Sequence, residues 1–307
     1  MDTRPNTHPA RRSARIGRIT ALAVTLGLAL TACARATTGG PGAGGTPPGP
    51  TPSDASKVLL LRVQSTGGFI APLALYQRYP TFSLYADGTV ITEGAQIDIY
   101  PQPALPPLLA THISDAGVQA ILRAAEQAGL TVPDVTYHGA VMPDAPDTVF
   151  TLSVNGHTHR ITVTALGSQS RPGMSTAEIH ARTALASLSS KLMDLRSWLP
   201  AGSIGQDHPY VPTAMDVFVK DGAPKDPGGT LHEPDIAWPL ATPLASLGGP
   251  LPTQLSGGPT RCGVVDGADL KLLWPKAERA NQLSPWVSEG QRFGLSFRPL
   301  LPDELGC

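Results

Sequence analysis

The chain has 307 residues, with 24 acidic and 23 basic side chains and a formal net charge of −1. No basic block occurs after residue 35, so the electrostatic footprint of a nucleic-acid-binding protein is absent. Aromatic residues make up only 5%, which argues against surfaces that stack bases or sugars, while 32 glycines and 32 prolines indicate many turns and long loops.

The first 32 residues have the pattern of an export signal. Arginines dominate the charge of residues 1–18, and an apolar run follows from Ile19 to Leu30. This run of about 12 residues is shorter than the ~20 that span a bilayer, but it has the length of a signal-peptide core. We therefore predict a signal peptide over residues 1–32.

The predicted leader ends in Leu30-Thr31-Ala32-Cys33. This segment resembles a bacterial lipobox, in which a branched residue and two small residues precede the lipidated cysteine. The resemblance covers only this short stretch. It implies cleavage before Cys33, a lipid on its thiol, and anchoring at the extracytoplasmic face of the cell membrane.

Other interpretations of the leader stay open. Ala32-Cys33-Ala34 also satisfies the small-x-small rule of an ordinary cleavage site. An uncleaved anchor would require a longer apolar run. The pair Arg11-Arg12 lacks the residues that normally surround a twin-arginine export signal.

The cysteine count agrees with lipidation. The chain has three cysteines, an odd number for an exported protein. If Cys33 carries lipid, Cys262 and Cys307 remain as an even pair in an oxidising compartment, and we expect a disulfide between them. Two buried free thiols are the alternative.

Residues 33–56 follow as a segment rich in glycine and proline without apolar periodicity. Such a segment cannot bury enough surface to fold. We predict a disordered tether that could hold the body up to ~60 Å from the membrane.

The body begins with a short apolar run, Val58–Val63, which predicts a buried strand. Asp87-Gly88 lies between β-forming residues, a strong signal for a hairpin. A two-residue loop there pairs Leu84 with Ile91 and places both side chains on one face.

Two helices and a second hairpin follow. Helical spacing and capping residues predict one helix between Ser114 and Gly129 and another between Ser175 and Pro200. Between them, Asn155-Gly156 predicts a hairpin of strands 148–154 and 157–163. Its apolar face is expected to carry seven residues: Phe150, Leu152, Val154, His157, His159, Ile161 and Val163.

Residues 57–200 therefore read as strand, hairpin, helix, hairpin and helix. This order predicts an α+β domain of antiparallel β-hairpins with helices packed on one face of the sheet.

Residues 201–307 are harder to assign. The proline-rich part, 201–260, is expected to be either a wrapping loop or a region of unrecognised strands. A strand at 261–265, a helix from Asp266 disturbed by Pro275, and a hairpin turning at Glu289-Gly290 complete the chain. This part forms either a separate unit or part of the first domain.

His157-x-His159 is the strongest metal candidate, because residues i and i+2 of a strand face the same way. A site needs a third protein ligand, for which His138, Asp144 and Asp147 are the nearest candidates in sequence. The alternative is a polar fringe on an apolar hairpin face.

No sequence motif marks an enzyme. Gly-x-Ser-x-Gly, Ser-x-x-Lys and phosphate-binding loops are absent from the sequence. A pair of catalytic carboxylates could still converge in three dimensions, because such pairs need no sequence proximity.

Several body motifs resemble a group of secreted lipoproteins from high-GC Gram-positive bacteria. The motifs are Gly67-Gly68, Tyr85-x-Asp87-Gly88-x-Val90, the Ser-x-Ala-Gly at Ser114, and Arg298-Pro-Leu-Leu-Pro-Asp-Glu304 before the last cysteine. The resemblance implies a location but no chemistry.

We therefore expect a lipid-anchored binding or accessory protein of the cell envelope, without a cofactor. Its expected partner is the membrane, through the lipid on Cys33, and no nucleic acid. The alternatives are a hydrolase without a recognisable motif and a metal-binding surface protein.

Overall fold

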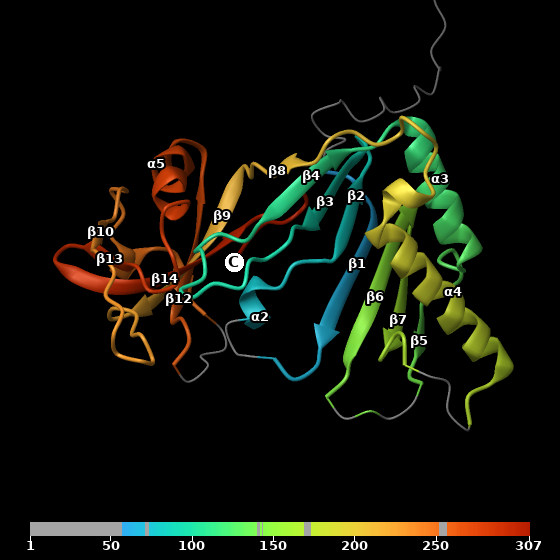
Figure 1. The fold of residues 1–307 in the computed structure, drawn as a ribbon, viewed down its shortest axis with the longest axis horizontal. Coiled ribbons are helices and arrows are strands. Elements are labelled where there is room, and N and C mark those ends of the chain that lie inside the picture. Colours follow the sequence, from blue (N-terminus) through green and yellow to red (C-terminus); the bar gives the residue numbers. More distant parts are fainter. Residues whose placement is uncertain (1–56, 71–73, 140–141, 143, 169–172, 252–256) are drawn as a thin grey trace, which may run out of the picture. The chain divides into compact units, whose positions relative to one another are not determined.

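The computed structural model describes residues 57–70, 74–139, 142, 144–168, 173–251 and 257–307 (Figure 1). These described residues belong to one compact unit. The predicted signal peptide, Cys33 and the tether lie outside the described residues. Among the helices of the described part, none combines the length and apolar character that crossing a membrane requires.

The described residues form two sheets, of eight and six strands. Nearly all neighbouring strands are antiparallel, and the parallel pairs are β5–β7 and β10–β13. The fold is therefore mixed, with helices and mostly antiparallel sheets, as predicted at this coarse level.

The first sheet has the order β5-β7-β6-β1-β2-β3-β4-β8 (Figure 1). The bounds of its strands are β1 Leu59–Gly67, β2 Phe82–Tyr85, β3 Thr89–Glu93, β4 Leu108–His112, β5 Val135–Tyr137, β6 Pro146–Val154, β7 His157–Thr164 and β8 His208–Pro209. The short helix α2 (Ala74–Gln77) lies between β1 and β2 in the chain.

The hairpin at Asn155-Gly156 is confirmed. Both residues have positive φ, 52° and 75°, as a type I′ turn requires. Leu152 lies opposite His159 and Val154 opposite His157, which is the predicted register. Val149, whose side chain faces away from Phe150 and Leu152, is also buried at 1% exposed, so the opposite face of β6 is covered at this position.

The register predicted for the first hairpin is wrong by one residue. Leu84 pairs with Val90, not with Ile91. The amide of Gly88 donates to the carbonyl of Tyr85 at 3.0 Å and Gly88 has φ +82°, so the loop has three residues. The extra residue moves Ile91 to the opposite face of the sheet from Leu84.

The predicted caps define two helices. Helix α3 (Asp115–Gln127) begins after Ser114, whose hydroxyl accepts the amide of Gly117 at 3.4 Å. Helix α4 (Thr176–Met193) begins after Ser175, whose hydroxyl accepts the amide of Glu178 at 3.1 Å. The Glu178 side chain does not complete a capping box, because it accepts the amide of Gly139.

The second sheet has the order β10-β13-β14-β9-β12-β11. Its strands are β9 Ala214–Asp221, β10 Ile236–Ala237, β11 Gly249–Pro250, β12 Arg261–Asp266, β13 Pro285–Ser288 and β14 Gln291–Pro299. The proline-rich segment thus supplies β9, a central strand that pairs with both β12 and β14.

The chain end follows the prediction more closely. Strands β13 and β14 turn at Glu289-Gly290, where both residues have positive φ, and the buried Phe293, Leu295 and Phe297 belong to one core cluster. Helix α5 (Gly267–Ala277) contains Pro275 and continues two residues beyond it. Short 3-10 turns occur at Leu195–Ser197 and Leu244–Ser246.

Candidate functional site

The candidate site is built around residues 298–307, which comprise the end of strand β14 of the second sheet and the segment after it. Arg62, on β1 of the first sheet, binds the carboxylate of Asp303 through two nitrogens, at 3.0 and 2.8 Å. Asp303 also accepts the Tyr85 hydroxyl at 2.7 Å, and Arg62 donates to Ser83 at 3.1 Å. The last segment of the chain is thereby held against the first sheet by charge-assisted bonds.

A second ion pair, between Arg298 and Glu304, lies within the same segment. Arg298 binds both oxygens of Glu304, at 2.8 and 2.7 Å, and Glu304 also accepts the amide of Leu301 at 2.9 Å. The Arg298 guanidinium lies 4.9 Å from the ring centre of Tyr79. These contacts fix the turn that precedes Cys307.

Two tyrosines outside this segment, Tyr79 and Tyr210, add hydrogen bonds from neutral donors to it. The Tyr79 hydroxyl donates to the carbonyl of Pro299 at 2.9 Å, and that of Tyr210 to the carbonyl of Leu300 at 2.7 Å. Burial raises the pKa of both phenols above the ordinary value of 10. Both therefore remain neutral hydrogen-bond donors at physiological pH.

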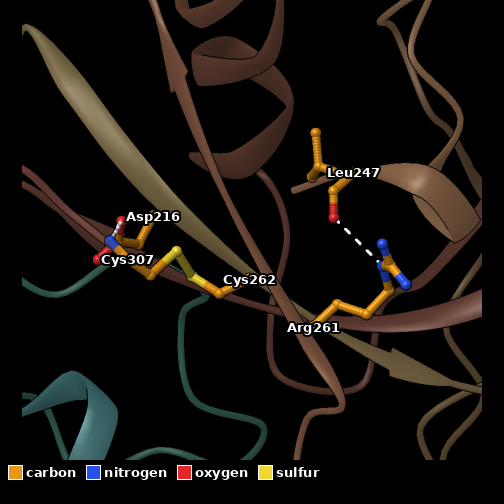
Figure 2. Close-up of a disulfide and its surroundings, with 5 residues drawn as sticks. All are labelled: Asp216, Leu247, Arg261, Cys262 and Cys307. Atoms are coloured by element: carbon orange, nitrogen blue, oxygen red, sulfur yellow. Dashed lines mark hydrogen bonds between the residues drawn. A yellow bond between two sulfur atoms is a disulfide. The ribbon is translucent and has the colours of Figure 1, made fainter. Parts of the chain in front are cut away.

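The predicted disulfide joins Cys262 and Cys307 (Figure 2). Cys262 belongs to β12 and is 5% exposed, whereas Cys307 is exposed. The residue before Cys262, Arg261, donates to the carbonyls of Leu247 and Gly248 at 3.3 and 3.1 Å. One sulfur is therefore held on a well-anchored strand and the other at the surface.

Asp216 lies beside this disulfide (Figure 2). One of its oxygens accepts the amide of Cys307 at 3.0 Å, and a carboxylate oxygen lies within 4.8 Å of both sulfurs. Asp216 is 4% exposed. Burial raises its pKa above the ordinary value of 3.8, while the Cys307 amide and the charge of Arg298 oppose the rise.

An open cavity of about 580 Å³ lies next to these groups. Its lining combines charged side chains, the disulfide and apolar residues. It is lined by Tyr76, Arg78, Asp216, Phe218, Gly249, Pro250, Leu251, Cys262, Arg298, Glu304, Leu305, Gly306 and Cys307. The volume is within the range of small-molecule sites in proteins.

Arg78 has a distinctive place in this cavity. One of its nitrogens donates to the carbonyls of Ser65 and Gly67, at 3.2 and 3.1 Å. None of the salt bridges among the described residues includes Arg78, whereas Arg298 is paired with Glu304. Arg78 and Arg298 also line a smaller adjacent cavity of about 260 Å³.

The predicted histidine pair lies on β7, the strand next to the edge strand β5 of the first sheet. His157 is exposed, and Nδ1 of the half-buried His159 lies 3.1 Å from the carbonyl oxygen of Val132. Asp147 pairs with Thr164, at the far end of the same hairpin from His157.

No third ligand joins the two histidines among the described residues. In that part of the chain, the one group of three candidate ligand side chains is Asp216, Cys262 and Cys307, and its two sulfurs are bonded to each other. The metal hypothesis therefore rests on the histidine pair alone.

The residues of the candidate site were missed by sequence reasoning, apart from the cysteine pair. Arg62 and Asp303 are 241 positions apart, so no local spacing connects them. One signal was available: Asp303, Glu304 and Arg298 stand within the C-terminal motif used for the lipoprotein resemblance.

Comparison with known proteins adds no precedent for this site. No protein-family model, no curated protein and no solved structure matches the chain.

Proposed function

We propose that the chain is an exported lipoprotein, anchored through Cys33 at the extracytoplasmic membrane face, whose body binds a small ligand without catalysis. The observation that carries the binding role is the open cavity beside the disulfide. The lipid anchor draws support from the cysteine pairing, because the disulfide uses two of the three cysteines and leaves Cys33.

We infer that the ligand is a small anion with an apolar part. Arg78 offers a positive charge that no described carboxylate neutralises, and a guanidinium matches carboxylate and phosphate groups. The same cavity has an apolar wall in which the rings of Tyr76 and Phe218 lie 5.3 Å apart, next to Leu251. A charged head at Arg78 and an apolar body on this wall would use both kinds of lining.

Binding is favoured over hydrolysis by the state of the carboxylates. Glu304 is engaged by both Arg298 nitrogens and by the Leu301 amide, so its oxygens are already occupied as acceptors. Asp216 is buried beneath Cys307 and bonded to its amide. This pair does not offer the freely accessible acid and base that a glycosidase-type mechanism uses.

We further infer that α3 and α4 cover one face of the first sheet. Val63, Phe82, Phe150 and Ile161 are successive cross-strand partners, so their side chains share one face. These residues belong to the same buried cluster as side chains of both helices. Such a layer would provide a rigid support for the strand that carries Arg62.

Three small aromatic probes of similar size test the binding role: phenyl phosphate, benzoate and benzylamine. The protein's thermal midpoint should rise with the two anions and not with the amine, because a ligand that binds only the folded state stabilises it. Arg78→Gln should abolish the rise. Arg160→Gln, an exposed arginine on β7, is the matched control and should behave as the wild type. Equal responses to the amine and the anions would contradict the proposal.

A further inference from the structure

Beside the cavity, the carboxylate of Asp216 lies next to the Cys262–Cys307 disulfide. A buried carboxylate is costly to desolvate, and the hydrogen bond that Asp216 accepts from the Cys307 amide, its one such bond among the described residues, offsets only part of that cost. Asp216 nevertheless occupies a site within 4.8 Å of both Sγ atoms. A proton-carrying group next to a disulfide is useful when the bond between the sulfurs breaks.

The two sulfurs differ in access. Cys307 is exposed and lines the open cavity of about 580 Å³, so an incoming thiolate can reach it. Cys262 is 5% exposed and sits on a strand paired on both edges. This asymmetry defines one attacked sulfur and one leaving sulfur.

We propose that Cys262–Cys307 is a redox-active disulfide that exchanges with an external dithiol, with Asp216 as the group that gives a proton to the sulfur of Cys262. The inference is independent of the proposed anionic ligand, because the exchange depends on Asp216 and the ligand on Arg78.

Two successive thiol–disulfide exchange steps reduce the protein disulfide. A thiolate of the dithiol attacks Sγ of Cys307, the S–S bond breaks, and its electron pair leaves on Sγ of Cys262, which takes the proton of the Asp216 carboxyl group. The second thiol of the dithiol loses its proton to solvent and attacks the dithiol's own sulfur in the mixed disulfide, which releases the thiolate of Cys307; this thiolate then takes a proton from solvent. The dithiol is oxidised by two electrons, the protein disulfide is reduced to two thiols, and Asp216 regains its proton from water.

The fold is suited to surviving reduction. Residues 298–304 remain attached through Arg62–Asp303, Arg298–Glu304 and the tyrosine hydroxyl bonds when the covalent link is open. The Cys307 amide also keeps its bond to Asp216. The two thiols would therefore stay close enough to reform the disulfide.

Burial that raises the pKa of Asp216 supports this role, because a larger fraction of the carboxyl then holds a proton near neutral pH.

The test measures reduction of the native, oxidised protein by dithiothreitol, followed by thiol alkylation and mass spectrometry. We expect a rate that rises linearly with dithiothreitol concentration and a reduced protein with an unchanged circular dichroism spectrum. At pH 6, Asp216→Asn should be reduced about 10-fold more slowly than the wild type. Asp221→Asn, the same change at an exposed position of the same strand, should leave the rate unchanged.

Two results would overturn the inference. The first is a wild-type rate that saturates at the rate of global unfolding, which would mean that only unfolded molecules react. The second is an Asp216→Asn variant reduced as fast as the wild type. If that variant does not fold, the pH dependence of the wild type provides the test. The rate constant of its reduction, divided by the concentration of dithiothreitol thiolate, should fall as pH rises through the pKa of Asp216. A value that does not change with pH would overturn the inference.

Discussion

Arg62 and Asp303 form a two-bond salt bridge across 241 positions of the chain, and their side chains are only 12% and 21% exposed. The pair joins the first sheet to the segment that carries Cys307. Because Asp303 also accepts the Tyr85 hydroxyl, its removal would leave the donors of Arg62 and of the buried Tyr85 without this acceptor.

We therefore expect Asp303→Ala to lower the free energy of unfolding by about 2–3 kcal/mol, because breaking one partner of a shielded pair strands the other charge. Chemical denaturation followed by circular dichroism measures the change. Asp235→Ala is the matched control, since Asp235 pairs with Arg292 in an exposed bridge and should contribute little. Equal losses in the two variants would show that the Arg62 pair has no special role.

Gly306 determines how closely the segment approaches Asp216. It has φ +80°, and a Cβ there would lie 2.5 Å from an Asp216 oxygen and 2.7 Å from a Val264 carbon. Gly306→Ala should cost about 3 kcal/mol, from the left-handed backbone and from overpacking together. Gly290→Ala, at φ +76° with nothing within 4 Å of its Cβ, isolates the backbone cost of about 1 kcal/mol. A Gly306→Ala variant no less stable than Gly290→Ala would refute the close approach.

Asp216 should give stability a distinct pH dependence. Since burial raises its folded-state pKa above the ordinary 3.8, folding favours the protonated carboxyl. The corresponding stability is fully present below about pH 3.8 and is lost as pH rises through the raised pKa. Relative to Asp216→Asn, the wild type should therefore lose thermal stability as pH rises from 4 to 7.

Asp226 serves as a control because its pKa is shifted in the direction opposite to that of Asp216. The amides of Leu231 and Thr230 lower the pKa of Asp226. Its contribution to folding stability is therefore present above the ordinary pKa of 3.8 and is lost as pH falls through the lowered pKa. The difference between wild type and Asp226→Asn should shrink as pH falls below 4. Parallel curves for the wild type and Asp216→Asn between pH 4 and 7 would show that Asp216 is not perturbed.

The lipid anchor makes a separate prediction about Cys33. Cys33→Ala should release the protein from the membrane fraction or stop processing of the precursor, because the lipid and the cleavage both depend on that residue. Cys307→Ser, which removes a different cysteine, should remain in the membrane fraction. Unchanged membrane retention of a normally processed Cys33→Ala protein would exclude lipidation as the anchor.

The features that sequence reasoning predicted correctly are local. The Asn155-Gly156 and Glu289-Gly290 turns need positive φ at both positions, and Ser114 and Ser175 supply hydroxyl acceptors for free amides at helix starts. These requirements are met within a few residues, so the sequence displays them directly.

The features that were missed depend on distant partners. Strand β9 looked like an irregular, proline-rich region, yet it is central because β12 and β14 pair with both its edges. The loop at Asp87-Gly88 likewise contacts a residue outside the hairpin: a Cβ on Gly88 would clash with the carbonyl oxygen of Ile113, and the amide of Ile113 donates to the carbonyl of Gly88 at 2.8 Å. The cavity combines side chains from both halves of the chain, and no spacing rule brings Arg78 to Arg298.

The most direct test of the binding role is a crystal structure of the protein grown with phenyl phosphate. We predict that the phosphate contacts the Arg78 guanidinium and that the phenyl ring lies on the wall formed by Phe218 and Leu251, beside the Cys262–Cys307 disulfide. A ligand bound elsewhere, or a cavity that stays empty at saturating ligand concentration, would contradict the account.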